Sequence, residues 1–353
     1  MIGSRLKLMR DILGISQGDL AMMIGTTQSG VASMEAGLYR PSSEYLKTIA
    51  QYTGFSIAFF EKEETADFPV GSILYRSLVS VKPTARGKAH AIAQAAFELA
   101  SILASKLKRI PINIPRLDDE PAMCAKIARA TLGLSPNTPI RGLLRCLERN
   151  GVLIFSLPLE IEGLDGFSVW AGNDPVRPVF ALLQGKTAYR EVFTAAEEFA
   201  HLVMHFPLRG LAAKDADQQA REFAREFLLP AEAMLSEMQK PVTLSSLAAM
   251  KSRWGVSISF LAKRAETLEL ISRNQHRYLI QQMHSNWGTK SEPGDEHVIP
   301  EKPSMVRKMA EMLYGNPIDV GRLTKDAGLP HTLIRDLLGI EPTQGRLLEF
   351  KKS

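Results

Sequence analysis

Three side chains with acid–base or metal-binding chemistry recur at every fourth position of Phe193–His205, FTAAEEFAHLVMH. Glu197, His201 and His205 would share one face of a helix, because side chains four residues apart lie about one turn from each other. In the pattern H-E-x-x-H, two His bind zinc and the Glu activates a water molecule. Here the window reads E-E-x-x-H, with Glu198 at the base position. The spacing therefore points to zinc-peptidase chemistry with the first ligand replaced by Glu197.

Short apolar runs precede this segment and are separated by Gly, Asp, Asn and Pro. They predict three strands, at Val152–Ser156, Gly166–Trp170 and Val179–Leu183. A second helix is predicted at Asp217–Leu229, where Pro230 ends it. A small sheet beside a helix that carries such a motif is the usual layout of zinc peptidases of the zincin type.

Composition limits the class of protein. The chain of 353 residues is long enough for two or three domains, and its 45% hydrophobic and 23% charged residues are ordinary for a soluble protein. The sequence has neither an apolar run as long as a membrane span nor a signal-peptide pattern, so we expect a cytoplasmic protein without a membrane partner. Cys124 and Cys146 form no CxxC pair and are expected to be reduced core thiols. A net charge of +5 permits nucleic-acid binding without establishing it.

The first 65 residues have the clearest helix signals. Four helices with caps or glycine stops are predicted, at Arg5–Gly14, Gln17–Ile24, Gln28–Ala36 and Ser42–Thr53. The second and third are short and are joined by a tight turn at Gly25. This arrangement is typical of a helix-turn-helix, whose second helix enters the DNA major groove.

Residues 16–54 also resemble the lambda-repressor-like (Xre) helix-turn-helix family. The shared features are the S-Q at the second helix, the Gly turn, T-Q-S into the third helix and the E-x-G-x-x-x-P exit. The resemblance implies a five-helix domain over residues 1–65. It places base-facing side chains at the start of the third helix and phosphate-facing ones around it, giving the DNA-binding set Gln17, Thr27, Gln28, Ser29, Ser33, Tyr39 and Arg40. The alternative is a small helical bundle used for protein contacts.

Charge bears on how this domain would bind. Residues 1–60 contain five basic and four acidic side chains, a balance of +1. One copy would bind DNA weakly, so we expect a dimer. Residues 76–116 contain eight basic side chains and only Glu98 as an acid. A linker is predicted up to Gly87 and a long helix at Lys88–Leu107, within this segment. The segment either braces flanking DNA or presents a solvated face.

A second resemblance covers the centre of the chain, to the ImmA/IrrE-type metallopeptidase domain. It is carried by LERNGVLIF, DGFSVW and RPVFALL, by YREVFTAAEEFAHLVMH, and by DQQAREFAREFLLP with MKSRWGVSISFLAKRAETLELIS after it. Together the two resemblances span about residues 5–300 and are similar to the fused Xre–ImmA regulators of bacteria and their mobile elements.

The ImmA/IrrE resemblance implies a changed site. The family's two metal-binding His fall on Glu197 and His201, its base on Glu198 and its third ligand, a Glu, on Asp217. Zinc accepts carboxylate oxygen, but this ligand set is harder and weaker than two imidazoles and a carboxylate. A shifted pair of His201 and His205 is an alternative. Three readings stay open: an active zinc endopeptidase, a metal site without catalysis, and a metal-free relic.

Electrostatics separates these readings. Glu197, Glu198 and Asp217 would converge near His201, and buried carboxylates without a cation are costly. Either a metal ion compensates, or His201 is protonated, or the cleft stays open to water, or an arginine points inward. The candidate arginines are Arg190, Arg221 and Arg225. We expect an arginine or water in place of zinc, and hence no cofactor.

The whole chain is predicted to be mainly α with a small β-sheet (α+β). Its expected divisions are a helix-turn-helix domain at 1–65, a basic linker and long helix at 66–117, a peptidase-like domain at 118–290 and a C-terminal helical module at 303–345. The expected function is a dimeric transcriptional regulator that binds a double-stranded operator, with the peptidase-like domain as a sensor or oligomerisation body for a protein partner or small inducer. The alternatives are a zinc endopeptidase that cleaves a repressor, with Glu198 as base, and one half of a toxin–antitoxin or phage-immunity pair.

Overall fold

The computed structural model describes residues 2–62, 68–69, 81–185, 187–205, 211–288, 292–295 and 300–340. The fold is mostly helical with one three-stranded sheet, which confirms the predicted class. Most of the predicted linker after Glu61, including Arg76, and the end of the predicted C-terminal module lie outside the described residues. In the described ranges, no helix combines the length and the apolar character that crossing a membrane requires.

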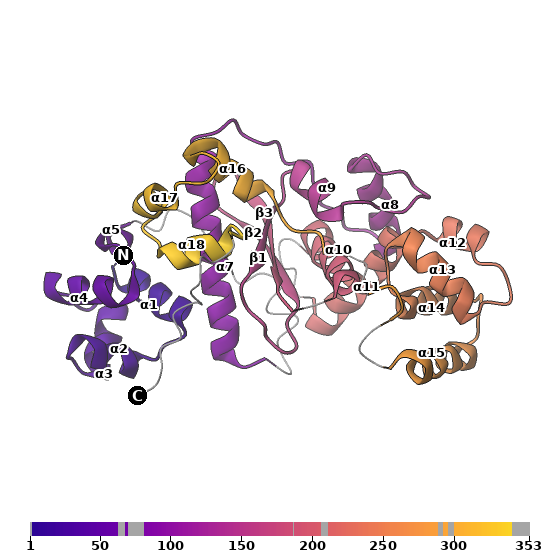
Figure 1. Cartoon of the computed structure of the whole chain (residues 1–353), viewed down its shortest axis with the longest axis horizontal. Helices are drawn as coiled ribbons and strands as arrows, with labels where there is room; N and C mark the ends of the chain where they lie inside the picture. The colour runs from indigo at the N-terminus through magenta and orange to yellow at the C-terminus, as the bar shows by residue number, and fades with distance from the viewer. Residues whose placement is uncertain are drawn as a thin grey trace.

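Five helices form the N-terminal part, at one end of the molecule (Figure 1). They are α1 (Ile2–Leu13), α2 (Gln17–Ile24), α3 (Gln28–Glu35), α4 (Ser43–Thr53) and α5 (Ile57–Glu61). The Ser16 hydroxyl and the Asp19 carboxylate form a capping box that starts α2. Gly25 ends α2 with a φ of 68°, a left-handed conformation that favours glycine. Local sequence thus sets the turn between α2 and α3.

The long helix α7 (Pro83–Ser105) runs beside this end of the molecule (Figure 1). The predicted boundary between linker and helix at Gly87 is wrong, because the helix already begins at Pro83. Proline is tolerated as the first helical residue, where its missing N–H has no partner to lose. Gly87 lies inside the helix, where the packing of buried Ala and Leu side chains outweighs its low propensity.

The sheet is the central layer. It contains β1 (Leu153–Leu157), β2 (Gly166–Ala171) and β3 (Arg177–Leu183) in the order β1-β3-β2. Strands β1 and β3 are parallel, and β2 pairs with β3 in the antiparallel sense. Alternate side chains enter different cores, so that Leu153 and Phe155 face one core and Ile154 the other.

Helices cover both faces of the sheet. The first core joins α7, the N-terminal helices and the C-terminal helices α16 (Met305–Tyr314), α17 (Val320–Ala327) and α18 (His331–Leu337). The second core lies against α8 (Pro121–Thr131), α9 (Leu143–Arg149), α10 (Ala188–Met204) and α11 (Ala213–Leu228). It continues into the layer of α12 (Ala231–Glu237), α13 (Leu244–Trp254), α14 (Ile258–Thr267) and α15 (Arg273–Trp287). Figure 1 shows this layer at the end of the molecule opposite α1–α5.

Polar contacts bind the N-terminal helices to α7 and to the C-terminal helices. Arg5 is only 1% exposed, and its guanidinium lies 2.6 Å from the Glu98 carboxylate of α7. The Lys62 ammonium donates to the Ala327 carbonyl at 2.6 Å, and the Ser56 N–H donates to the Gly328 carbonyl at 3.1 Å. The N-terminal helices are therefore packed onto their neighbours.

A half-buried histidine of α7 is expected to make the stability of the chain depend on pH. The His90 ring lies 3.2 Å from the Pro69 carbonyl and 5.2 Å from the Phe68 ring centroid. Burial lowers the pKa of His90 below its ordinary value of 6.5, against the effect of its backbone contacts. Because the folded pKa is depressed, the unfolded chain binds more protons as the pH falls below about 6.5.

We therefore expect the free energy of unfolding to fall as the pH drops from about 6.5 through the folded pKa of His90, and this contribution to be complete above 6.5. Urea unfolding between pH 7.5 and 5 measures it. In His90→Gln the decrease should be smaller, since glutamine does not titrate but can still reach the Pro69 carbonyl. An identical pH dependence in both proteins would contradict the assignment to His90.

Candidate functional site

The third helix of the N-terminal part has an apolar inner side and a polar outer side. Val31 and Met34 are fully buried in the first core, whereas Gln28 and Ser29 are exposed. The Thr27 hydroxyl caps α3 by accepting a hydrogen bond from the Gly30 N–H at 3.1 Å. Of the predicted base-facing residues, Gln28 and Ser29 therefore lie at the exposed start of α3, beside the exposed cap residue Thr27, and Ser33 is half-buried on the next turn.

The predicted phosphate contacts divide into two groups. Tyr39 and Arg40 are exposed, just after α3. The Tyr39 hydroxyl donates to the Gly30 carbonyl at 2.9 Å, which keeps the ring beside the helix start. Gln17 differs, because its side-chain amide donates to the Glu35 carboxylate at 2.8 Å. Its amide nitrogen is thus used to join α2 to α3.

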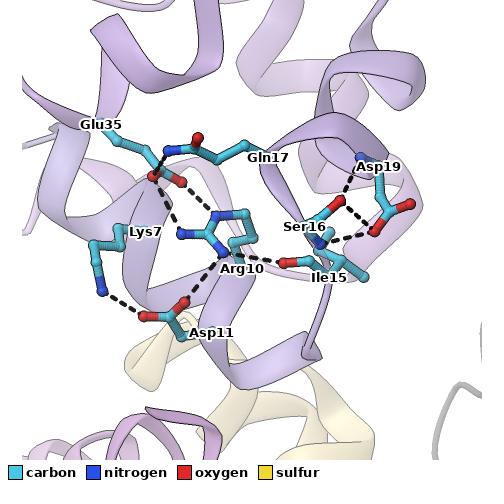
Figure 2. A network of polar contacts seen from close by, with 8 residues as sticks. All are labelled: Lys7, Arg10, Asp11, Ile15, Ser16, Gln17, Asp19 and Glu35. Carbon is cyan, nitrogen blue, oxygen red and sulfur yellow. Dashed lines mark hydrogen bonds and ion pairs between the residues drawn. The ribbon is translucent and has the colours of Figure 1, made fainter. Parts of the chain in front are cut away.

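Glu35 is the centre of a polar network that sequence analysis did not single out (Figure 2). It accepts hydrogen bonds from Gln17 and from the Arg10 guanidinium, whose Nε lies 2.6 Å from Glu35 Oε1. Arg10 also donates to the Ile15 carbonyl at 3.1 Å. The network links α1, the α1–α2 connection, α2 and the end of α3, and so fixes the angle at which α3 is presented.

Replacing Glu35 by Gln should lower the free energy of unfolding by about 1–3 kcal/mol, because the half-buried Arg10 guanidinium loses its charged acceptor. Urea denaturation of the full chain measures this effect. Glu44→Gln, at an exposed site on α4, is the matched control and should change stability by about 0.5 kcal/mol or less. Equal effects of the two substitutions would show that the network does not stabilise the domain.

Two cations of the basic segment around α7 contact other parts of the chain. The Lys106 ammonium lies 2.9 Å from the Asp326 carboxylate of α17. The Arg116 guanidinium lies over the Trp170 ring, 4.0 Å from its centroid. These two cations hold elements of the chain together, and the bracing of flanking DNA by the segment stays a prediction.

The central helix α10 buries the side chains that correspond to the zinc-peptidase motif. Glu197, Glu198 and His201 are all buried between the sheet and α11. Glu198 has no exposed surface, and its carboxylate accepts a hydrogen bond from the Ser168 hydroxyl of β2 at 2.8 Å. Ser168 was not predicted to take part. A polar residue in an otherwise apolar strand was the only signal for it.

An arginine lies between the two acids that would replace metal ligands. Arg221 Nε is 3.4 Å from Glu197 Oε1, and its Nη2 is 3.6 Å from Asp217 Oδ2. Arg221 is one of the three arginines that the sequence proposed as compensating charges. A guanidinium here supplies positive charge where a zinc ion would otherwise have to supply it.

The residues present do not fit a zinc ion. Within the ranges that the structure describes, no three His, Cys, Asp or Glu side chains are placed to hold a metal ion together. In the alternative pair, His201 Nδ1 and His205 Nδ1 share a hydrogen bond of 2.8 Å. His205 Nε2 in turn lies 3.0 Å from the Gln219 side-chain oxygen, and burial lowers the pKa of His205. The imidazoles are therefore engaged with each other and with Gln219.

A cleft of about 710 Å³ opens beside these residues. Its walls come from α10, α11, α14 and α15 and from residues 292–295. Glu197, Asp217 and Arg221 line it, while Glu198 is fully buried beneath. The cleft thus offers a mixed surface of acids, arginines and apolar side chains, with the residue at the base position held against the sheet.

Comparison with known families locates two matches. A helix-turn-helix family model matches residues 6–60, and a model described as an IrrE N-terminal-like domain matches residues 147–266. No curated protein matches the chain significantly. The first match covers α1–α5 and implies DNA binding, and the second extends from α9 through the sheet and α10 to α14. The chain therefore carries a helix-turn-helix DNA-binding domain of the Xre type and an IrrE N-terminal-like (ImmA/IrrE) peptidase domain, the two families that its sequence resembles.

Proposed function

We propose that the protein is a sequence-specific transcriptional regulator that binds a two-fold operator as a dimer. The support is the exposed polar start of α3, where Gln28 and Ser29 have no packing role. Glutamine pairs with the major-groove edge of adenine through two hydrogen bonds. Tyr39 and Arg40 lie beside this surface and suit phosphate contacts. The small net charge of the domain favours two copies acting on two half-sites.

The peptidase-like domain serves in this proposal as a sensor or oligomerisation body and not as a hydrolase. The observation that carries the proposal is the contact of Arg221 with both Glu197 and Asp217. An activated water needs a Lewis acid or a base that faces the substrate cleft. Here a guanidinium lies between Glu197 and Asp217, and the fully buried Glu198 accepts a hydrogen bond from Ser168 and does not line the cleft.

The domain limits belong to the same proposal. We assign residues 1–65 to DNA binding, 66–117 to a connecting segment with a long helix, 118–290 to the peptidase-like domain and 303–345 to a C-terminal module. The C-terminal helices share the first core with α1–α5 and α7. In this arrangement they transmit a change in the peptidase-like domain to the spacing of two helix-turn-helix units.

The test is a promoter reporter placed under the operator that the protein selects. Glu198→Gln keeps the shape and the hydrogen-bonding capacity of the side chain but cannot act as a catalytic base. It should regulate the reporter like the wild type, while Gln28→Ala should lose regulation. If Glu198→Gln abolishes regulation but retains the wild-type melting temperature and DNA affinity, the protein is a peptidase and the proposal fails.

A further inference from the structure

One arginine in the cleft forms no direct ion pair within the described part of the chain. Arg225 of α11 lines the cleft, and its guanidinium makes no hydrogen bond or ion pair with any residue that the structure describes. Burial lowers the pKa of Arg225, and its cationic neighbours Arg221 and Arg264 add to this effect against the pull of Glu222 and Glu197. A half-buried guanidinium is costly when no acceptor compensates for the lost water.

The other described lysines and arginines of the cleft each lie beside an acid. Arg190 lies 2.7 Å from Asp165, and Lys263 lies 2.8 Å from Glu266. Glu292 and Asp295 both contact the buried ammonium of Lys251, which also lies over the Tyr189 ring. Arg221 lies between Glu197 and Asp217, which leaves Arg225 as the cleft-lining arginine without an ion pair in the described ranges. Arg225 is therefore the described cation of the cleft that can receive an additional acid group.

The rest of the wall combines hydroxyl side chains with a group of apolar ones. Phe193 of α10 and Phe260 of α14 lie edge to face, with ring centroids 4.9 Å apart. Val256, Ile280 and Met283 also line the cleft. A volume of about 710 Å³ lies within the range of small-molecule sites, which combine a mostly apolar surface with a few polar groups that fix orientation.

We propose that this cleft binds a small organic monocarboxylate, with its carboxylate on Arg225 and its apolar body against Phe193 and Phe260. A guanidinium can donate two parallel hydrogen bonds to a carboxylate. A doubly charged phosphate ester fits less well, because one of its charges would meet the acids of the cleft without a free cation. The inference rests on the proposed non-hydrolytic role of the domain, and it names the class of ligand that the domain senses.

Isothermal titration of the full chain with 4-phenylbutyrate, hexanoate and indole-3-acetate tests the proposal, without DNA in the cell. At least one acid should bind with a stoichiometry of about one per chain. Its uncharged amide and the phosphate ester of the corresponding alcohol should each bind at least about tenfold more weakly. Because DNA is absent, failure here leaves the reporter test of DNA-dependent regulation standing, and the two proposals fail separately.

Variants assign the carboxylate to Arg225. Arg225→Gln should weaken binding of the acid at least about tenfold. Arg225→Lys keeps the charge but not the two-pronged donor, so its affinity for the acid should lie between those of the wild type and Arg225→Gln. Arg149→Gln, at an exposed arginine of α9 outside the cleft, should bind like the wild type. Wild-type melting temperatures of the free variants exclude misfolding. The proposal is overturned if none of the acids binds, if acid and amide bind equally, or if Arg225→Gln binds unchanged.

Discussion

Replacing Gln28 by alanine is expected to weaken binding to the operator by about 10- to 100-fold per half-site, because a bidentate contact between a side chain and a base contributes about 1–3 kcal/mol of discrimination. Gln28 is exposed at the start of α3, whose packing depends on Val31 and Met34. The melting temperature should therefore stay within about one degree of the wild type. Titration of labelled operator by fluorescence anisotropy at fixed salt measures the affinity.

The matched control is Gln51→Ala, at an exposed glutamine of α4. It should leave both affinity and stability unchanged. Loss of affinity for the operator together with unchanged affinity for unrelated DNA would assign Gln28 to base recognition. Equal losses on both DNAs would place it among the phosphate contacts, and no loss on either would contradict the placement of α3 in the groove.

The second large effect is expected at the joint between the N-terminal helices and α7. Replacing Glu98 by Ala should lower the free energy of unfolding by about 3–5 kcal/mol, because it leaves the buried Arg5 guanidinium without its carboxylate. Arg5 also donates to the Lys62 carbonyl and lies over the Phe59 ring, so it cannot easily turn to solvent. Urea denaturation of the full chain measures the loss.

A surface ion pair offers the comparison. Glu311→Ala removes the partner of Arg307 within α16, where both side chains are partly solvated, and should cost less than about 1 kcal/mol. If Glu98→Ala costs no more than this control, the N-terminal helices are not held to α7 by the buried pair. The route proposed from the peptidase-like domain to the DNA-binding helices would then lose its main polar contact.

Features encoded by neighbouring residues were predictable from the sequence. Ser16 and Thr27 cap the helices that follow them, and Gly25 and Gly54 end helices in the left-handed conformation. Helix α4 begins at Ser43 with Ser42 as its cap, one residue after the predicted start. The three strands were predicted within a few residues of their limits. In each case the deciding hydrogen bonds join residues only a few positions apart, so a single stretch of sequence contains all the partners.

Features that depend on distant partners were missed. Thr138 followed by Pro139 is typical of a helix start, yet α9 begins only at Leu143, where the Glu301 carboxylate accepts the N–H groups of Leu144 and Arg145 from far along the chain. The Thr138 carbonyl instead accepts a hydrogen bond from Arg129. Such pairings arise when the fold brings remote segments together, and no local pattern marks them.

The candidate site likewise has features that the sequence revealed and features that depend on distant partners. The spacing of Glu197, Glu198 and His201 identified the helix and its peptidase-like pattern, and the charge argument named Arg221 among three candidates. Which arginine approaches the acids depends on the packing of α11 against α10. The bond between Glu198 and Ser168 depends on the packing of α10 against β2, which strand periodicity does not reveal.

The most direct test of the central claim is selection of DNA sites from a random double-stranded pool by the purified full-length protein, with the Gln28→Ala variant in parallel. The account predicts that the wild type enriches a two-fold symmetric sequence with half-sites about one helical turn apart, and that the variant loses preference at the bases under α3. Enrichment of no sequence by the wild type, or of the same sequence with the same preference by both proteins, would contradict a regulator that reads its operator with this helix.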